Sequence, residues 1–203
     1  MITFGIDVDE VIRNCLPRLV EIYNKEFNET KTVDDVTDYD VEKIFPRIAE
    51  ERGMTAREWF FQVHGYDVFM DTDPIEGAKE AMEILHRYGK IIIITKQEGE
   101  RNKKFVIDWL LVHEIPYDDI CFVTDKSIIK CDYFIDDHIE NFKGVNARYG
   151  ILITAPYNKI FGRFNNEDLA RKRIRKISNC VFVHRFDNIM QFAKWDYDEY
   201  LEV

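Results

Sequence analysis

Four segments of the chain share a pattern: each is an apolar run typical of a buried β-strand, and each ends in polar side chains that could do chemistry. These side chains are carboxylates, one hydroxyl and lysines. Because the carboxyl ends of parallel strands meet at one edge of a sheet, we expect the groups to converge there. In chain order, the ends carry Asp7 and Asp9 (strand 2–7), Thr95 and Lys96 (strand 90–95), Lys126 (after strand 120–123), and Asp136 with Asp137 (after strand 133–135).

Carboxylates gathered at one sheet edge repel one another, which raises their pKa values and destabilises the site unless a cation is bound. A site that offers only oxygen ligands favours Mg²⁺ over zinc or copper. Magnesium accepts phosphate as a further ligand, and a lysine and a threonine hydroxyl suit the phosphoryl oxygens. The residues therefore indicate phosphoryl chemistry, in which a carboxylate can act as nucleophile and form an aspartyl-phosphate.

The elements that must position these side chains alternate between strand and helix from residue 74 onward. Such alternation is typical of a three-layer α/β fold with a parallel sheet. Residues 15–74 are mostly helical and interrupt the alternation after the first strand. We therefore predict a three-layer, Rossmann-like α/β core formed by residues 1–14 and 75–203, with a small helical cap inserted at residues 15–74.

Local signals mark several helix boundaries in this scheme. Pro17 opens a helical pattern that runs to Phe27, and Thr55 with Glu58 predicts a capping box. Gly89 ends a helical pattern over residues 76–88. Further helices are expected near residues 41–51, 55–64, 100–112 and 166–177, and the last strands near residues 151–153 and 181–183.

The composition limits the classes of function. The chain has 203 residues, 38 of them acidic and 28 basic, and a formal net charge of -10. Such an acidic surface disfavours polymeric nucleic acid and anionic lipid, so the expected partner is a small molecule. The four cysteines form no C-x-x-C pair and the longest aliphatic run is too short to span a bilayer, so we expect a reduced, cytoplasmic protein without a membrane segment. No pattern indicates an oligomeric state.

The strand-end residues resemble the four motifs of the haloacid dehalogenase superfamily, in order and on the right elements. Within that superfamily, residues 125–137 (DKSIIKCDYFIDD) are similar to the 5′(3′)-deoxyribonucleotidase family. That family places its phosphate lysine in such a context, ten residues before a double aspartate, as in this sequence. Residues 155–158 (APYN) also resemble a segment of the family, and the likeness covers most of the chain. The cap is matched only in size and position.

The resemblance implies a role for each motif residue. Asp7 would attack phosphorus, and Asp9 would protonate the leaving alcohol and then activate the hydrolytic water. Thr95 and Lys126 would hold the phosphoryl oxygens. The resemblance also implies a nucleoside monophosphate, in particular a deoxyribonucleotide, as the substrate.

The resemblance implies a magnesium site as well. Its ligands would be the Asp7 carboxylate, the Asp9 backbone carbonyl and an acid of the last motif, with Asp137 as the direct ligand and Asp136 in support. One departure from the family lies close by, because Glu10 follows Asp9 where the family usually has glycine.

A second departure affects phosphate binding. Lys96 follows Thr95 where the nucleotidases usually have serine, so a lysine there could add phosphate affinity in place of a hydroxyl contact. Outside the motifs, the cap carries aromatic residues at helical spacing, which we expect to be mostly core with one or two facing the substrate. They are Phe45, Trp59, Phe60, Phe61, Tyr66 and Phe69.

Alternative functions remain open at this point. The same residues could serve a phosphatase or phosphotransferase that acts on another small phosphate ester. A non-catalytic nucleotide-binding regulatory protein could also keep the fold, although such a protein has no need of both a nucleophile and an acid. A second D-x-D sequence, Asp71-Thr72-Asp73, precedes Pro74 and is interpreted as turn chemistry and not as a further motif.

Overall fold

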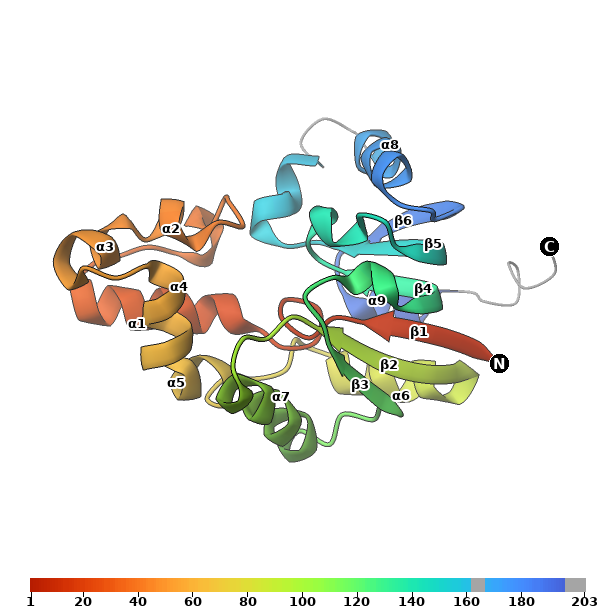
Figure 1. Ribbon diagram of the computed structural model, residues 1–203, viewed down its shortest axis with the longest axis horizontal. Coiled ribbons are helices and arrows are strands. Elements are labelled where there is room, and N and C mark those ends of the chain that lie inside the picture. Colours follow the sequence, from red (N-terminus) through yellow and green to blue (C-terminus); the bar gives the residue numbers. More distant parts are fainter. Residues whose placement is uncertain (162–166, 196–203) are drawn as a thin grey trace.

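The computed structural model describes residues 1–161 and 167–195 (Figure 1). Its centre is a six-stranded sheet with the order β3-β2-β1-β4-β5-β6, and every neighbouring pair is parallel. This sheet confirms the predicted α/β fold. The strands are β1 Ile2–Ile6, β2 Gly89–Thr95, β3 Asp119–Phe122, β4 Lys130–Asp136, β5 Asn146–Ile153 and β6 Phe182–Phe186.

The helices follow the order that the sequence patterns predict, with shorter elements in the cap. They are α1 Cys15–Phe27, α2 Val41–Ile44, α3 Pro46–Arg52, α4 Ala56–Glu58, α5 Gly65–Phe69, α6 Ala78–Tyr88, α7 Glu100–Val112, α8 Glu167–Ile177 and α9 Ile189–Ala193. A π-helical turn, Trp59–Val63, continues α4. Short 3-10 helices cover Val33–Asp35, Lys126–Ile128, Ile139–Phe142 and Pro156–Phe161.

Two local signals explain the division of the cap helices. The expected helix over residues 41–51 is split into α2 and α3, because Pro46 starts a new helix as its first residue. The capping box at the start of α4 is confirmed: the Thr55 hydroxyl accepts from the Glu58 N–H, and the Glu58 carboxylate accepts from the Thr55 N–H.

The sheet is buried on both faces, as a parallel sheet requires. On one face, alternate residues of β1, β2, β4 and β5 pack with α6, α7 and α9. On the other face, Ile94, Phe134 and Leu152 pack with the 3-10 helix Ile139–Phe142 and with α8. In the central strand, a Cβ on Gly5 would lie 2.5 Å from the end of the Ile94 side chain, so a larger residue there would displace its neighbours.

The residues of the predicted cap form an apolar cluster of their own. It draws on α1 to α5, and its largest buried members include Tyr23, Phe45 and Phe60. Figure 1 shows these helices beyond the carboxyl ends of the strands. This separate cluster supports the division into core and cap, whose bounds stay a prediction. Within the described residues, no helix combines the length and apolar character needed to cross a membrane.

Candidate active site

Three carboxylates meet at the carboxyl edge of the sheet, where the strand pattern predicts them. Asp7 directly follows β1, and Asp136 ends the neighbouring strand β4 with Asp137 after it. Each offers an oxygen within 4.8 Å of the others, and all three side chains are buried. Oxygen donors of this kind, packed this closely, suit a hard divalent cation such as Mg²⁺.

Lys126 is the cation that the structure places in this cluster. It opens the 3-10 helix after β3 and is buried, and its Nζ lies 2.7 Å from an oxygen of Asp7 and 2.7 Å from an oxygen of Asp136. Burial alone would lower the pKa of the ammonium, but the two carboxylates outweigh burial and raise it. Lys126 therefore stays charged.

One lysine does not neutralise three buried carboxylates. Burial raises the pKa of Asp7 to about 7, with Lys126 opposing the rise and Asp136 adding to it. Burial also raises the pKa of Asp137, and Asp136 and Asp7 raise it further. A divalent cation at this point would hold both groups in the charged form, so the donor set fits the metal that the sequence predicts.

The two acids of the last motif have different partners. Asp136 accepts hydrogen bonds from the His138 N–H at 2.8 Å and the Asn141 side chain at 2.9 Å, in addition to Lys126. Asp137 accepts from the Tyr157 hydroxyl. Asp136 is thus occupied by donors from the protein, whereas Asp137 has one donor. This difference favours Asp137 as the direct metal ligand.

Asp9 is not one of the clustered carboxylates, and its side chain accepts hydrogen bonds from other residues of the protein. Its Oδ1 accepts from Nε of Arg13 at 2.8 Å and Nη2 at 2.6 Å, and the Cys15 thiol lies 3.2 Å away. Its Oδ2 accepts from the Gln97 amide at 2.8 Å. The side chain of Asp9 is nevertheless 32% exposed, so solvent or substrate can reach this carboxylate.

Arg13 ties Asp9 to the cap. Its guanidinium is fully buried, donates to the Phe69 carbonyl at 3.2 Å, and lies over the rings of Phe69 (4.8 Å) and Trp109 (5.3 Å). Phe69 belongs to α5 of the cap and Trp109 to α7 of the core. The two connections between core and cap also pair with each other, through a bridge between Arg13 and Pro74.

The two residues expected to bind phosphate at the end of β2 differ in burial. Thr95 is buried beside the cluster, and no described residue hydrogen-bonds to its hydroxyl, which leaves the hydroxyl available to a phosphoryl oxygen. Lys96 is exposed, and among the described acids none forms an ion pair with it. It lines the cavity next to the cluster.

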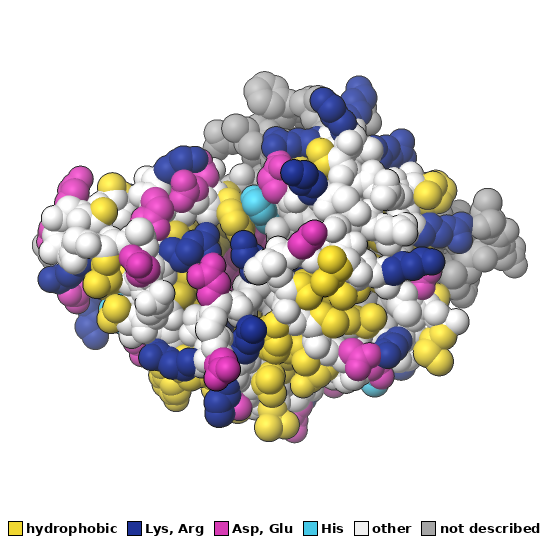
Figure 2. Space-filling view, viewed as in Figure 1, with side chains coloured by type: hydrophobic (Ala, Val, Ile, Leu, Met, Phe, Trp, Pro, Cys, Tyr) yellow, Lys and Arg dark blue, Asp and Glu magenta, His cyan; other side chains and the backbone are white. Residues whose placement is uncertain are grey.

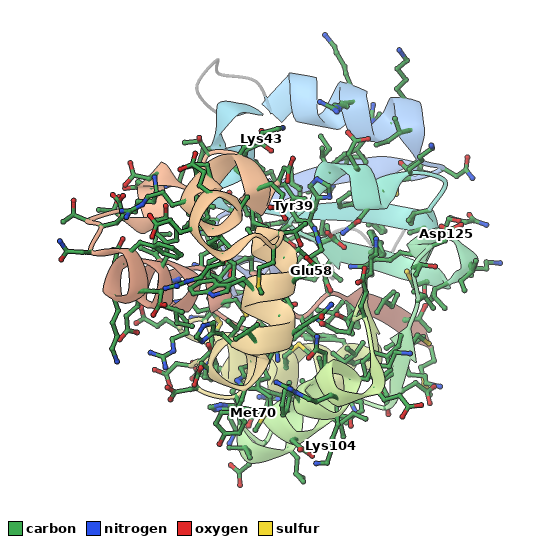
Figure 3. All side chains as sticks on the ribbon, turned by 60° about the vertical axis from the view of Figure 1, so that its left-hand side comes forward. Tyr39, Lys43, Glu58, Met70, Lys104 and Asp125 are labelled. Atoms are coloured by element: carbon green, nitrogen blue, oxygen red, sulfur yellow. The ribbon has the colours of Figure 1, made fainter. Side chains whose placement is uncertain are left out.

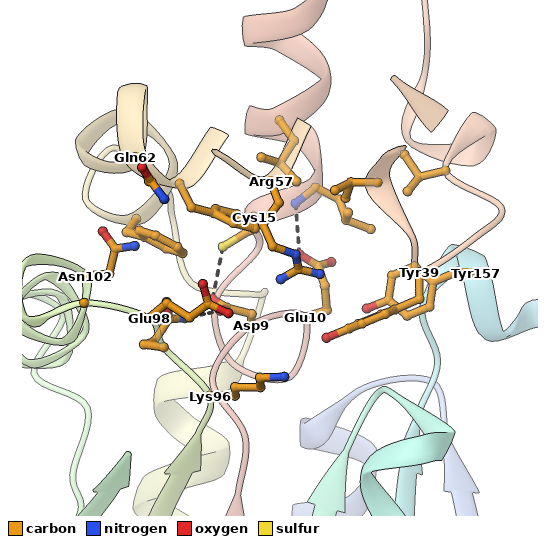
Figure 4. A pocket seen from close by; sticks show the side chains of 18 of the residues that line it. Asp9, Glu10, Cys15, Tyr39, Arg57, Gln62, Lys96, Glu98, Asn102 and Tyr157 are labelled. Atoms are coloured by element: carbon orange, nitrogen blue, oxygen red, sulfur yellow. Dashed lines mark hydrogen bonds between the residues drawn. The ribbon is translucent and has the colours of Figure 1, made fainter. Parts of the chain in front are cut away.

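That cavity lies between the cap and the core and has a volume of about 560 Å³. Asp9, Glu10 and Tyr157 line it on the side of the carboxylates. Phe61 and Phe69 line it from the cap, so two of the six cap aromatics face the cavity. The other cap aromatics are mostly core, as predicted. Figure 4 shows Lys96, Asp9 and Glu10 along one wall of the cavity.

The structure shows how Glu10 fits at the position where the family usually has glycine. Its backbone adopts a positive φ of 58°, a conformation that glycine reaches most easily. The side chain accepts a hydrogen bond at 2.9 Å from the Leu16 N–H, at the start of α1. Burial raises the pKa of Glu10 to about 8, and this backbone contact only partly opposes the rise.

Tyr39 is a cap residue close enough to the carboxylates to be influenced by their charge. It lies where the cap meets the core (Figure 3), and its ring stacks on His138 with centroids 3.6 Å apart. Its ring also meets the Tyr157 ring edge to face at 5.5 Å. Burial raises the pKa of Tyr39, and the Asp137 and Asp7 carboxylates raise it further. Tyr39 therefore lines the end of the cavity that is next to the carboxylates.

Comparison with known proteins identifies the family. A family model described as 5′ nucleotidase, deoxy (pyrimidine), cytosolic type C matches residues 1–195. The chain belongs to this nucleotidase family. It is a phosphoric monoester hydrolase, and the resemblance that the motif residues carry is confirmed.

Curated relatives of the nucleotidase agree with this assignment. A 5′(3′)-deoxyribonucleotidase of Bacillus subtilis is 26% identical over 175 residues, which cover 83% of this chain and 96% of the relative. A protein of the same name from Clostridium acetobutylicum is 27% identical over 169 residues, covering 80% of this chain and 87% of the relative.

Solved structures agree with the fold of the nucleotidase. A haloacid dehalogenase-like hydrolase from Burkholderia xenovorans has a TM-score of 0.56 and 13% identity, covering 100% of this chain and 99% of the other. A HAD family hydrolase from Deinococcus radiodurans, determined with bound phosphate and sodium, has a TM-score of 0.53 and 10% identity over 91% of this chain and 90% of the other.

The sequence pattern missed several residues that the structure places in the site. Arg13 and Gln97 hold Asp9, Tyr157 holds Asp137, and Tyr39 lines the cavity next to the carboxylates. Tyr157 had a usable signal, because it belongs to the segment 155–158 (APYN) that resembles the family, although no role was predicted for it. Arg13 and Tyr39 had none, since their positions depend on how the cap folds back over the core.

Proposed function

We propose that the nucleotidase hydrolyses nucleoside monophosphates, in particular deoxyribonucleotides, through a phosphoryl group held covalently on Asp7, and that it depends on Mg²⁺. The observation that carries the proposal is the buried cluster in which Lys126 lies 2.7 Å from both Asp7 and Asp136, beside Asp137. A dianionic substrate can approach a carboxylate nucleophile only where cations offset the combined charge.

In the first half-reaction, an Asp7 oxygen forms a bond to phosphorus as the bond from phosphorus to the ester oxygen breaks. Asp9, in its acid form, gives its proton to the departing ester oxygen, and the nucleoside leaves as an alcohol. Lys126 and the Thr95 hydroxyl hold the phosphoryl oxygens during the transfer, and Lys96 adds a second cation from the open side.

In the second half-reaction, the Asp9 carboxylate takes a proton from a water molecule, which attacks phosphorus and releases Asp7 and inorganic phosphate. Arg13 and Gln97 fix the direction of the Asp9 carboxylate for both proton transfers. Asp7, the Asp9 carbonyl and Asp137, with Asp136 in support, would hold Mg²⁺, which when bound would supply charge neutralisation at the phosphoryl group.

The nucleotide half of the proposal rests on the family and its relatives, together with the cavity. The two matched relatives are named 5′(3′)-deoxyribonucleotidases. A cavity of about 560 Å³ beside the cluster has room for a nucleoside, and pockets of this size are typical of small-molecule sites. We place the activity in the cytoplasm, because all four cysteines are free thiols.

Phosphate release across a panel of esters tests the proposal. The panel holds 5′ and 3′ deoxyribonucleotides, ribonucleotides and sugar phosphates, each assayed with Mg²⁺ and then with EDTA. We expect Mg²⁺-dependent turnover concentrated on nucleotides. Turnover on sugar phosphates alone would refute the nucleotide assignment, diversion of the phosphoryl group to added alcohols would indicate a phosphotransferase, and nucleotide binding without turnover would indicate a regulatory protein.

A further inference from the structure

Asn158 is a buried side-chain amide that holds the backbone beside the carboxylate cluster. It lies in the 3-10 helix Pro156–Phe161, shortly after β5, and is 2% exposed. Its Nδ2 donates to the Asp137 carbonyl at 2.7 Å and to the Ile153 carbonyl at 2.7 Å. One of these carbonyls directly follows β4 and the other ends β5, and the two strands are neighbours in the sheet. Asn158 therefore ties two strand ends together at the carboxyl edge.

The oxygen of the same amide is held as well. The Asn158 Oδ1 accepts from the Ala155 N–H at 3.0 Å and from Nη2 of Arg185 at 2.9 Å. Arg185 belongs to β6, and its Nε also donates to the Thr154 hydroxyl at 3.1 Å. Both donors and both acceptor positions of the amide are thus occupied. A buried polar group with all its partners in place is rigid, so the position of the Asp137 backbone depends on Asn158.

The residue before Asn158 holds the side chain of the same acid. The Tyr157 hydroxyl donates to Oδ2 of Asp137, and the Asp137 Oδ1 accepts from no described residue. Two consecutive residues therefore contact Asp137 at its carbonyl and at its carboxylate. Together they determine where the Oδ1 of Asp137 lies relative to the other acids of the cluster.

The position of a ligand oxygen matters more for Mg²⁺ than for a larger cation. Mg²⁺ demands nearly octahedral geometry with ligands at about 2.0–2.1 Å, whereas Ca²⁺ accepts six to eight oxygens in flexible arrangements at about 2.3–2.6 Å. Groups that hold a metal ligand in place typically change metal affinity about 10- to 100-fold when they are removed. A residue that fixes Asp137 should therefore affect Mg²⁺ more than Ca²⁺.

We infer that Asn158 is a positioning residue that holds Asp137 where the cluster fits Mg²⁺ better than Ca²⁺. The inference rests on the proposed function, in which Asp137 is a direct metal ligand. It goes further by assigning the preference for one metal to a side chain that hydrogen-bonds to the backbone of the ligand and not to its carboxylate.

The test measures metal binding in the absence of substrate. Wild type, Asn158→Ala and Arg185→Lys are freed of metal with EDTA and dialysed, and isothermal titration calorimetry gives the Kd of Mg²⁺ and of Ca²⁺. Lysine keeps the charge of Arg185 but cannot hold Asn158 and Thr154 together. The matched control is Asn24→Ala, which removes an amide that also bonds to backbone groups, at Lys31 in the cap, and should leave both Kd values unchanged.

We expect Asn158→Ala to weaken Mg²⁺ binding about 10- to 100-fold and Ca²⁺ binding by less, so that the preference for Mg²⁺ falls. Arg185→Lys should give a smaller change in the same direction. Thermal melting monitors the fold, and Arg185→Lys carries the test if Asn158→Ala does not fold. An unchanged Kd for Mg²⁺, or an equal loss for both ions, would overturn the inference.

Turnover gives a second readout that a purely structural role would not move. In Asn158→Ala, the Mg²⁺ concentration for half-maximal phosphate release should rise, and kcat at saturating Mg²⁺ should stay close to that of the wild type. A lower kcat with an unchanged Mg²⁺ dependence would contradict the role of Asn158. A wild type that binds no Mg²⁺ and is equally active in EDTA would instead contradict the proposed function, so the two failures are distinguishable.

Discussion

The carboxylate cluster and the remote end of the cavity, where Asn102 and Gln62 lie, are built in different ways. In the cluster, Asp7, Asp136 and Lys126 are buried and bonded to one another, and each stands at or just beyond the end of a strand. At the remote end, Asn102 and Gln62 lie on the first turn of α7 and on a turn of the cap, and no described residue hydrogen-bonds with either side chain.

This difference separates the groups that carry out the reaction from those that could distinguish one substrate from another. The cluster is held by paired strands, so its geometry is fixed before a substrate binds, as charge stabilisation of a phosphoryl group requires. At the remote end no described residue hydrogen-bonds with the Asn102 and Gln62 amides, so a bound ligand can supply their partners. Changes in the cluster should therefore affect all substrates, and changes at the remote end should affect the ratio between substrates.

The largest effect is expected for Asp7→Asn, which replaces the nucleophile with an amide of similar shape. Turnover of every ester should fall by at least about 10³-fold, because no other group in the cluster can take the phosphoryl group. Phosphate release measures the loss, and circular dichroism checks the fold. The matched control is Asp73→Asn in the second D-x-D sequence, an exposed residue whose replacement should leave the rate within about twofold.

Lys126→Met should be next in size. It removes the buried cation between Asp7 and Asp136, and we expect turnover to fall about 10²- to 10³-fold. The free energy of unfolding should also fall by about 3–5 kcal/mol, since the carboxylates stay buried without their partner. Denaturant unfolding measures this decrease. Lys104→Met, at an exposed ion pair with Asp108, is the control, and a Lys126→Met protein as stable and active as wild type would remove Lys126 from the site.

The charge of the cluster should be visible as a pH dependence of stability in the metal-free protein. Asp7 has a pKa of about 7 in the folded chain against 3.8 in a model peptide. The folded state therefore binds more protons between these values, and stability should fall as the pH rises from about 4 to 7. Thermal melting in EDTA from pH 5 to 8 measures the trend, and stability that rises over this range would contradict the account.

Added Mg²⁺ should reverse much of this loss at the upper end of the range, because it binds the charged carboxylates. Glu10, whose pKa of about 8 is also raised by burial, should extend the fall in stability beyond pH 7. Glu10→Gln should make stability nearly independent of pH above pH 7, and the fall in stability due to Asp7 at lower pH should remain.

Arg13→Lys should give the smallest of these effects and a more specific one. Lysine cannot supply both N–H groups that hold the Asp9 Oδ1, so Asp9 should protonate the leaving oxygen less well. We expect about a tenfold loss of kcat on nucleotides and a smaller loss on p-nitrophenyl phosphate, whose leaving group needs no proton. An equal loss on both esters would indicate a structural role, and Arg18→Lys, at the partly exposed ion pair with Asp71, is the control.

The contrast between strand ends and the cavity under the cap also explains which features the sequence could predict. The parallel sheet, the alternation of strands and helices, and the motif residues were predictable, because apolar runs that stop at acids signal buried parallel strands. Helix α7 was predicted with the bounds that it has, Glu100–Val112. These features depend on residues near one another in the chain or on the geometry of a parallel sheet.

The partners of the motif residues were not predictable in the same way. Arg13 contacts Phe69 and Trp109, which are 56 and 96 positions further along the chain, and Tyr39 reaches His138 from the cap. Such contacts depend on how the cap lies on the core, for which the periodicity of a single sequence carries no signal. In the sequence, Asn102 looks like an ordinary polar residue of a helix. The structure shows that it is buried and that no described residue hydrogen-bonds with its side chain.

The central claim is that Asp7 takes the phosphoryl group, and a burst experiment with Asp9→Asn tests it most directly. This variant keeps the nucleophile but cannot activate the water of the second half-reaction, so with p-nitrophenyl phosphate and Mg²⁺ it should release about one nitrophenol per protein and then stall. Mass spectrometry of the acid-quenched protein should locate the phosphoryl group on Asp7. Turnover by the wild type of the same ester, with no burst and no phosphorylated Asp7 in the variant, would contradict the account.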